Sequence, residues 1–255
     1  MDDQNHCQRA NVHSVRFIEL DVLRGFAIIF MIVLHFFWDL DYFGILPLNT
    51  QFYAMNIIVP IMFFLLVGIC QAVNNQKYRH EPKKMYIRTI QRGLWILNLG
   101  MLFTILTAIV FPDRPILFGV LHCIGVSVLL SALFLRFKTI NIIIGTIILI
   151  LGGIIANFYL VTTPTMLQLA LGIHQPDIAH HTIDYFPILP WLGVCLIGIA
   201  LGNLLYNDNT RRFPVPDLTK YAPTKVVSWL GQHSLAIYLV HQPVIAGVLF
   251  LVLLR

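Results

Sequence analysis

Four residues in the first apolar stretch of the chain could carry acid–base chemistry. Asp21, Arg24, His35 and Asp39 all lie within residues 16–41, RFIELDVLRGFAIIFMIVLHFFWDLD. In a helix that turns by about 100° per residue, these side chains fall within about 60° of one another, on one face. Titratable side chains are costly in hydrocarbon, so such a stripe indicates function rather than stability. Asp39 follows His35 by one helical turn, which is where a carboxylate can orient an imidazole as a general base.

Polar residues of two later apolar stretches are expected at the same depth. His122 lies in ILFGVLHCIGVSVLL, between two glycines that allow close approach of another helix or a ligand. Ser234, Tyr238 and His241 lie in LGQHSLAIYLVHQPVIAG and share one helical face. Either histidine taken alone could instead be a satisfied hydrogen-bond partner between helices. Together they extend the candidate catalytic set to His35, Asp39, His122 and His241, with Ser234 and Tyr238 as donors to an oxyanion.

Charged and aromatic residues near the ends of these stretches complete the candidate site. Arg24 could be a topology anchor among lipid headgroups, but its pairing with Asp21 and its alignment with His35 favour a phosphate-binding role. Asp184 and Trp191 are expected at the outer mouth of a later span. We interpret both as candidate substrate-contacting residues.

The composition requires a membrane to position these residues. Of the 255 residues, 58% are hydrophobic and 11% are charged, and apolar runs of spanning length recur along the whole chain. We predict an all-α, polytopic bundle of about seven transmembrane helices. Residues 1–15 form a polar cytoplasmic tail and 16–255 a single integral-membrane domain, without a cleavable signal peptide. The expected spans are 25–43, 54–74, 93–111, 117–135, 139–160, 188–206 and 231–253.

The basic residues predict the orientation of the bundle. With the N-terminus in the cytoplasm, all of the 17 Lys and Arg residues except Arg114 and Arg255 lie on the cytoplasmic side. This distribution explains the net charge of +5 without a nucleic-acid partner. It also places Arg24 at the inner boundary and His35 about 16 Å further in, near the midplane. The four cysteines are scattered, without ligand spacing, so neither a metal site nor a disulfide is expected.

Four motifs occur in order along the chain. They are Arg16, Leu20-Asp21, Leu23-Arg24-Gly25, Met31 and His35; Phe118-Gly119 with Leu121-His122; Asp184-Tyr185-Phe186-Pro187 with Pro190-Trp191; and Leu230-Gly231 with Ser234-Leu235 and Tyr238 to Pro243. Together they resemble the heparan-α-glucosaminide N-acetyltransferase catalytic-domain family, within the wider superfamily of multispan membrane acyltransferases. The resemblance runs from about residue 16 to 245.

The resemblance implies an enzyme that moves an acetyl group from cytosolic acetyl-CoA to an amine or hydroxyl of a sugar or glycan beyond the membrane. The phosphates of this cosubstrate would lie near Arg16, Asp21 and Arg24, and His35 would act as the base. One departure concerns the histidine thought to be catalytic in lysosomal relatives, which follows the first span. No histidine occurs here between Phe36 and Arg79, so His35 must supply that function.

Several alternatives stay open at this level. A proton-coupled transporter or channel would also use intramembrane His and Asp residues, although no inverted repeat is visible. A non-catalytic scaffold would not explain polar residues at one depth on three helices. Direct transfer and an acetyl-histidine intermediate are both compatible with the sequence, as are N- and O-acylation. The plasma membrane is the expected location, residues 161–187 are the expected acceptor-specificity segment, and a homodimer is left open.

Overall fold

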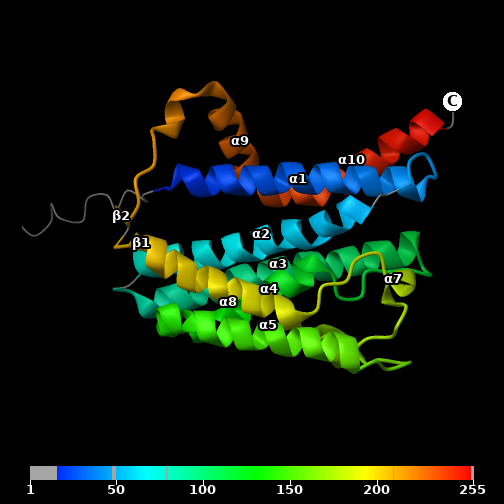
Figure 1. The fold of residues 1–255 in the computed structure, drawn as a ribbon, viewed down its shortest axis with the longest axis horizontal. Coiled ribbons are helices and arrows are strands. Elements are labelled where there is room, and N and C mark those ends of the chain that lie inside the picture. The colour runs from blue at the N-terminus through cyan, green and yellow to red at the C-terminus, as the bar shows by residue number, and fades with distance from the viewer. Residues whose placement is uncertain (1–15, 48–49, 79, 209, 254–255) are drawn as a thin grey trace, which may run out of the picture.

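The computed structural model describes residues 16–47, 50–78, 80–208 and 210–253 of the chain. The polar tail 1–15, with Cys7, lies outside the described residues. Helices make up most of the described chain (Figure 1). The long helices are α1 (Ile18–Tyr42), α2 (Thr50–Lys77), α3 (Pro82–Val110), α4 (Val120–Phe134), α5 (Asn141–Phe158), α8 (Ile188–Leu205) and α10 (Ser234–Leu253). The short elements are η2 (Leu135–Ile140), α6 (Met166–Leu171), α7 (Ile178–His181), β1 (Tyr206–Asn207), β2 (Thr210–Arg211), η3 (Leu218–Lys220) and α9 (Ala222–Gln232).

Within the described residues, 6 helical stretches are long and apolar enough to cross a membrane. One of them, Val120–Phe158, comprises α4, η2 and α5. Lys138 in η2 has a φ of 45°, which interrupts the helix, and α4 and α5 run in opposite directions (Figure 1). The predicted polytopic all-α membrane bundle is therefore confirmed. The predicted number of about seven spans is reached when α4 and α5 are counted as two separate spans.

Two helices begin earlier than the sequence predicts. α1 starts at Ile18 rather than at residue 25, with Glu19 and Asp21 in its first turn. Acidic side chains are favourable there, because the N-terminus of a helix carries a partial positive charge. α3 starts at Pro82 rather than at residue 93, so most of the predicted polar connection 75–92 is helical. Proline suits the first turn, where its missing N–H leaves no hydrogen bond unmade.

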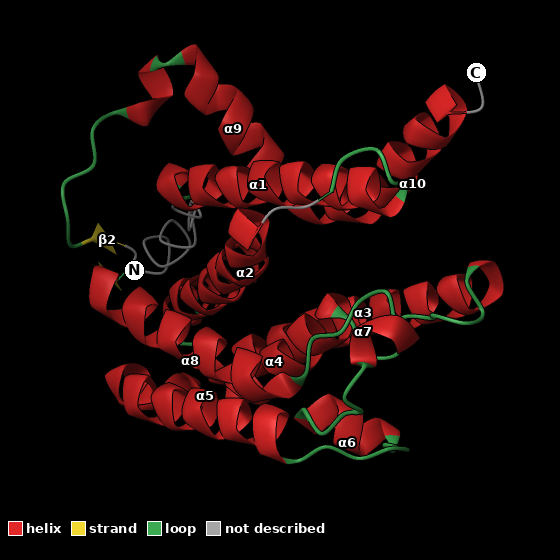
Figure 2. Ribbon diagram, turned by 45° about the vertical axis from the view of Figure 1, so that its right-hand side comes forward, coloured by secondary structure: helices red, strands yellow, loops and turns green. Residues whose placement is uncertain are grey.

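α2 and α8 pack closely at the centre of the bundle. A methyl group on Gly68 of α2 would collide with the carbonyl oxygen of Cys195, and one on Gly198 of α8 with that of Leu65. Small residues at these positions let the two backbones approach, as is usual where lipid supplies no hydrophobic force between helices. α5 covers the other side of α8, and α3 and α4 form a pair beside them (Figure 2).

α1, α9 and α10 form a second group, which contacts the rest of the bundle chiefly through α2 (Figure 1). α9 packs on the first half of α1 through two glycines. Gly25 faces the carbonyl of Val227, and Gly231 faces the carbonyl of Asp21. α10 then continues along α1, with Ile237 and Tyr238 against the buried residues Ile28 and Met31. This packing brings the two stretches with the most candidate residues side by side.

Candidate functional site

The polar stripe of α1 faces into the protein at both ends. Asp21 is 1% exposed and Asp39 is 8% exposed, whereas Arg24 and His35 are partly buried. The one-face arrangement expected from helical periodicity is therefore observed. The contacts of the two ends differ, and they divide the stripe into two clusters.

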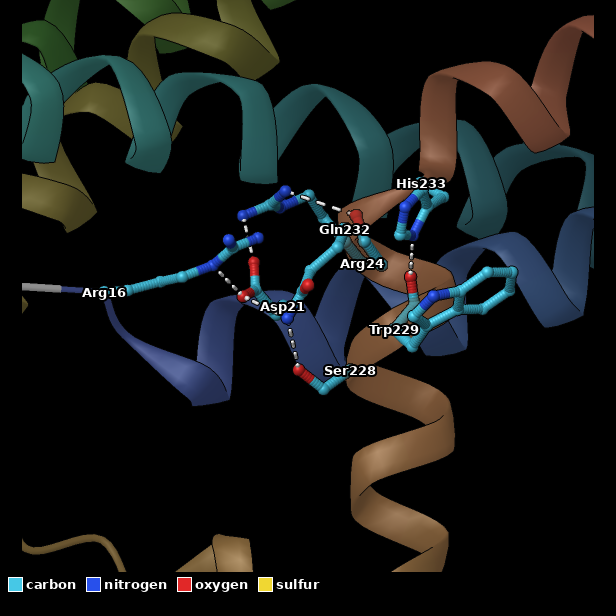
Figure 3. Close-up of polar contacts among 8 residues, drawn as sticks. Arg16, Asp21, Arg24, Ser228, Trp229, Gln232 and His233 are labelled. Carbon is cyan, nitrogen blue, oxygen red and sulfur yellow. Dashed lines mark hydrogen bonds and ion pairs between the residues drawn. The ribbon is translucent and has the colours of Figure 1, made fainter.

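The first cluster surrounds Asp21 at the N-terminal end of α1 (Figure 3). Arg16 Nε donates to Oδ2 and Arg24 Nη2 to Oδ1, each at 2.6 Å. Arg24 Nη1 also donates to the carbonyl oxygen of Gly231 at 3.3 Å, and Gln232 Nε2 to Asp21 Oδ2 at 3.4 Å. The guanidinium of Arg24 thus ties α1 to the end of α9. Its Nε is buried and has no hydrogen-bond partner among the described residues.

The second cluster lies where α1 contacts α10 and joins two histidines. The rings of His35 and His241 are 4.8 Å apart between centroids, and that of Tyr238 is 5.5 Å from His241. His241 Nδ1 is 2.7 Å from the carbonyl oxygen of Tyr238. A carbonyl can only accept, so Nδ1 carries the proton and Nε2 presents a lone pair. That Nε2 is buried without a hydrogen-bond partner in the described part of the chain.

Asp39 is oriented by a different residue from the one the sequence predicts. Its Oδ1 accepts a hydrogen bond of 2.7 Å from Gln242 Nε2 on α10, and its described contacts do not include His35. The expected pairing of Asp39 with His35 is therefore corrected: one turn of helix brings the residues near, but the side chain turns to the neighbouring helix. Asp39 Oδ2 and Gln242 Oε1 are buried without partners among the described residues. Gln242 was not a candidate, although it adjoins His241 and precedes a helix-interrupting proline.

His122 lies at the N-terminal end of α4 with both ring nitrogens engaged. Its Nδ1 accepts from the backbone N–H of Gly119 at 3.3 Å, which caps the helix. Nε2 must then carry the proton, and it donates to Thr104 Oγ1 at 3.3 Å. Thr104 in turn donates to the carbonyl of Ile116 at 2.7 Å. These hydrogen bonds hold the His122 ring at the start of α4, and Thr104 was not distinguishable in the sequence from other helical threonines.

Asp184 reaches the same helix end from the segment before α8. Its Oδ2 accepts a 2.8 Å hydrogen bond from the N–H of Val120. Burial raises the pKa of Asp184 to about 6, and the hydrogen bond from Val120 opposes part of that rise. The neighbouring backbone is fixed by a hydrogen bond of 2.9 Å from Phe186 N–H to the Phe118 carbonyl.

A small cavity lies between Tyr238 of α10 and the two residues His122 and Asp184 at the start of α4. Its volume is about 10 Å³, and it is lined by Gly100, Phe103, Ile116, Gly119, Leu121, His122, Asp184 and Tyr238. This is about the space of one water molecule. Because Tyr238 also packs on His241, a continuous run of polar side chains connects His35 to Asp184 through α10.

Two other candidates lie beside this run. Ser234 is the first residue of α10, one turn before Tyr238. Trp191 packs 5.2 Å from the rings of both Phe64 and Phe186, within an apolar cluster, and does not line the cavity. In the described part of the chain, no group of three or more His, Cys, Asp or Glu side chains is arranged to hold a metal ion. The thiols of Cys70, Cys123 and Cys195 are free.

Comparison with known proteins gives one assignment. The family model described as heparan-alpha-glucosaminide N-acetyltransferase, catalytic, matches residues 16–243. Comparisons with curated proteins and with solved structures gave no match. The matched region holds both clusters around α1, the cavity and the whole membrane bundle up to Pro243. The chain therefore belongs to the heparan-alpha-glucosaminide N-acetyltransferase catalytic-domain family, and is at the coarse level a membrane acetyltransferase.

Proposed function

We propose that the protein transfers an acetyl group from cytosolic acetyl-CoA to an amino or hydroxyl group of a sugar or glycan on the extracytoplasmic side. Family membership supports the reaction class. The observation that carries the proposal is the pair of His35 and His241 in the interior of the bundle, with a buried lone pair on His241 Nε2. A thioester and an acceptor on opposite sides of a bilayer can meet only at such a depth.

His35 is the proposed general base. As the acceptor nitrogen or oxygen attacks the thioester carbonyl, its proton passes to His35, and the CoA thiolate leaves and is protonated by the imidazolium that results. The neighbouring lone pair of His241 can accept a proton from the His35 imidazolium. His241 is thus the proposed partner of His35, in place of Asp39, to which the sequence assigns the orientation of the imidazole. Tyr238 has an O–H that can donate to the developing oxyanion.

The cluster at Asp21 is the proposed contact for the CoA phosphates. Both guanidinium groups pair with Asp21, but Arg16 is the more available cation, because its side chain is 59% exposed and that of Arg24, which also donates to Gly231, is 30% exposed. An extended pantetheine of roughly 15–20 Å would reach from Arg24 to His35, which are about 16 Å apart at a helical rise of 1.5 Å per residue. On the other side of Tyr238, the Asp184 carboxyl is the proposed contact for the acceptor.

One experiment tests this assignment. Purified protein in vesicles is given acetyl-CoA together with glucosamine or a glucosamine-terminated oligosaccharide, and release of the free CoA thiol is measured. We expect acceptor-dependent release that is lost in His35→Ala. Thiol release that does not depend on the acceptor contradicts the proposal, as does an unchanged rate of thiol release in the His35→Ala variant. Proton flux without any transfer would instead identify a transporter.

The donor site has a separate readout. Replacing Arg16 with Gln should raise the KM for acetyl-CoA and leave kcat nearly unchanged, because the guanidinium contacts the phosphates equally in the ground and transition states. Lys138→Gln, at the same membrane surface but on η2, is the matched control for the loss of one positive charge. An equal rise in KM in both variants would show that the effect is one of overall surface charge.

A further inference from the structure

A cationic cleft lies at the cytoplasmic end of α3, apart from the histidine pair. It has a volume of about 510 Å³ and is lined by Glu81, Pro82, Lys83, Lys84, Ile87, Arg88 and Gln91. Membrane proteins carry basic residues on this side to set their orientation, and those residues are ordinarily spread along loops. Here they line one hollow on the surface of a membrane-crossing helix.

Three cations converge on a single aromatic ring: Lys84 and Arg88, which line the cleft, and Lys77 at the end of α2. Around Tyr78, the Nζ atoms of Lys77 and Lys84 lie 5.8 and 5.9 Å from the ring centroid, and the Cζ of Arg88 lies 4.7 Å away. Arg88 also donates a hydrogen bond to the Tyr78 hydroxyl. The ring face stabilises each cation by about 0.5–1 kcal/mol at an exposed site. The three cations repel one another, and a bound anion would offset that repulsion.

The protein supplies only part of that negative charge. Glu81 pairs with Lys84 at 2.9 Å. The other two cations around the ring, Lys77 and Arg88, are therefore not neutralised by Glu81. Glu81 makes no side-chain hydrogen bond to the start of α3. An incoming anion would therefore meet a net positive cleft.

The surface that continues from the cleft into the membrane is apolar. Ile87, Leu94 and Trp95 are 46%, 46% and 62% exposed, and they follow Lys84 and Arg88 along the same side of α3. A ligand bound here would have its anionic group among the cations and an apolar part along the helix. We propose that this cleft at Lys84 and Arg88, together with Lys77 and Tyr78 beside it, binds the phosphate headgroup of an anionic phospholipid, whose acyl chain lies along Leu94 and Trp95.

A lipid fits these observations better than a soluble phosphate compound does. Each basic residue near the surface attracts anionic lipid by about 1 kcal/mol, and basic pockets beside membrane helices are suited to such headgroups. Tryptophan is favoured at the boundary between headgroups and chains. A soluble anion would use the cations and leave the adjoining apolar face without a function.

The test is selective lipid retention by the full-length protein. Protein released from micelles of mixed phosphatidylglycerol and phosphatidylcholine is weighed by native mass spectrometry, and the bound lipids are counted. The combined variant Lys77→Gln, Lys84→Gln, Arg88→Gln should lower the preference for phosphatidylglycerol by about tenfold or more. The control variant Arg136→Gln, Lys138→Gln, Lys225→Gln removes the same charge from elsewhere on the cytoplasmic side and should retain the preference.

A further variant should change phosphatidylglycerol retention in the opposite direction. Glu81→Gln leaves the cations in place and removes the competing carboxylate, so it should increase phosphatidylglycerol retention. Equal losses in the cleft and control variants, or no change in Glu81→Gln, would overturn a localised site. Displacement of the lipid by millimolar CoA or inorganic phosphate would also overturn it, because the cleft would then be a site for soluble anions.

Discussion

The two imidazole rings at the contact of α1 and α10 are not chemically equivalent to that of His122. His241 has one nitrogen held by a backbone carbonyl and the other buried with a lone pair and no described partner. Both nitrogens of His122 are held, one by the Gly119 N–H and one by Thr104. Proton transfer requires a nitrogen that is free to change partner. The geometry therefore favours His35 and His241 for catalysis and His122 for capping α4.

This difference predicts opposite patterns for histidine variants. His35→Ala and His241→Ala should each lower kcat by at least about 100-fold, the usual contribution of general acid–base catalysis, with little change in thermal stability. His122→Ala should lower kcat much less and should destabilise the protein by about 1 kcal/mol, the typical value of a lost helix cap. Paired kinetics and thermal unfolding in detergent separate the two effects. A larger loss of kcat for His122→Ala than for His35→Ala would reverse the assignment.

The Asp184 carboxyl predicts a pH dependence of stability. Its pKa is about 6 in the folded protein, above the ordinary value of 3.8. A raised carboxyl pKa favours folding while the carboxyl is protonated, so this contribution is fully present below about pH 4 and is lost as the pH rises through 6. The midpoint temperature of thermal unfolding, measured as the difference from that of Asp184→Asn, should decrease as the pH rises from 4 to 6. It should level off above pH 7. A flat difference across this range would mean that the group is not buried.

At the scale of elements, close helix packing depends on individual glycines. Gly152 and Gly153 are neighbours in α5, but a methyl group on Gly152 would lie 2.6 Å from Pro190 N on α8, whereas one on Gly153 would meet nothing within 4 Å. The same substitution at the two sites therefore tests packing while helix propensity is held constant.

We expect Gly152→Ala to destabilise the protein by about 1–3 kcal/mol, because α5 and α8 must separate. Gly153→Ala should be neutral, or stabilising by up to about 1 kcal/mol through helix propensity. Thermal unfolding of the two variants in one detergent provides the comparison. Equal effects would show that α5 does not lie against α8 in the membrane.

Sequence periodicity was sufficient to predict most of the helices but not their partners. The stripe on α1 could be predicted, because spacing within one helix determines which residues share a face. The hydrogen bond of Asp39 could not, since Gln242 is 203 positions away in the sequence. The predicted span begins at residue 25, later than α1, because the charges of Glu19, Asp21 and Arg24 precede the apolar run that defines the span. Only the fold brings the carbonyl of Gly231 to Arg24, and Gln232 to Asp21.

At the scale of the whole molecule, the distribution of charge predicts which loops face the cytoplasm. Asp113 lies between α3 and α4, and Arg136 lies between α4 and α5; both are exposed. In whole cells, a membrane-impermeant maleimide should label Asp113→Cys and should label Arg136→Cys only after the cells are permeabilised. The background protein should lack Cys7 and Cys70. Labelling of Arg136→Cys in intact cells would invert the proposed path of the acetyl group.

Tyr238 has a consequence for redesign of this protein. Its ring packs on His241 and also lines the cavity beside Asp184, so one side chain separates the histidine pair from the acceptor side. Under the proposed function, we expect that grafting or shuffling residues 161–187 from related sequences changes the acceptor preference without altering the residues proposed to bind the donor. A library confined to that segment, with position 238 as its one additional variable, would therefore test whether the two sides of Tyr238 can be changed independently.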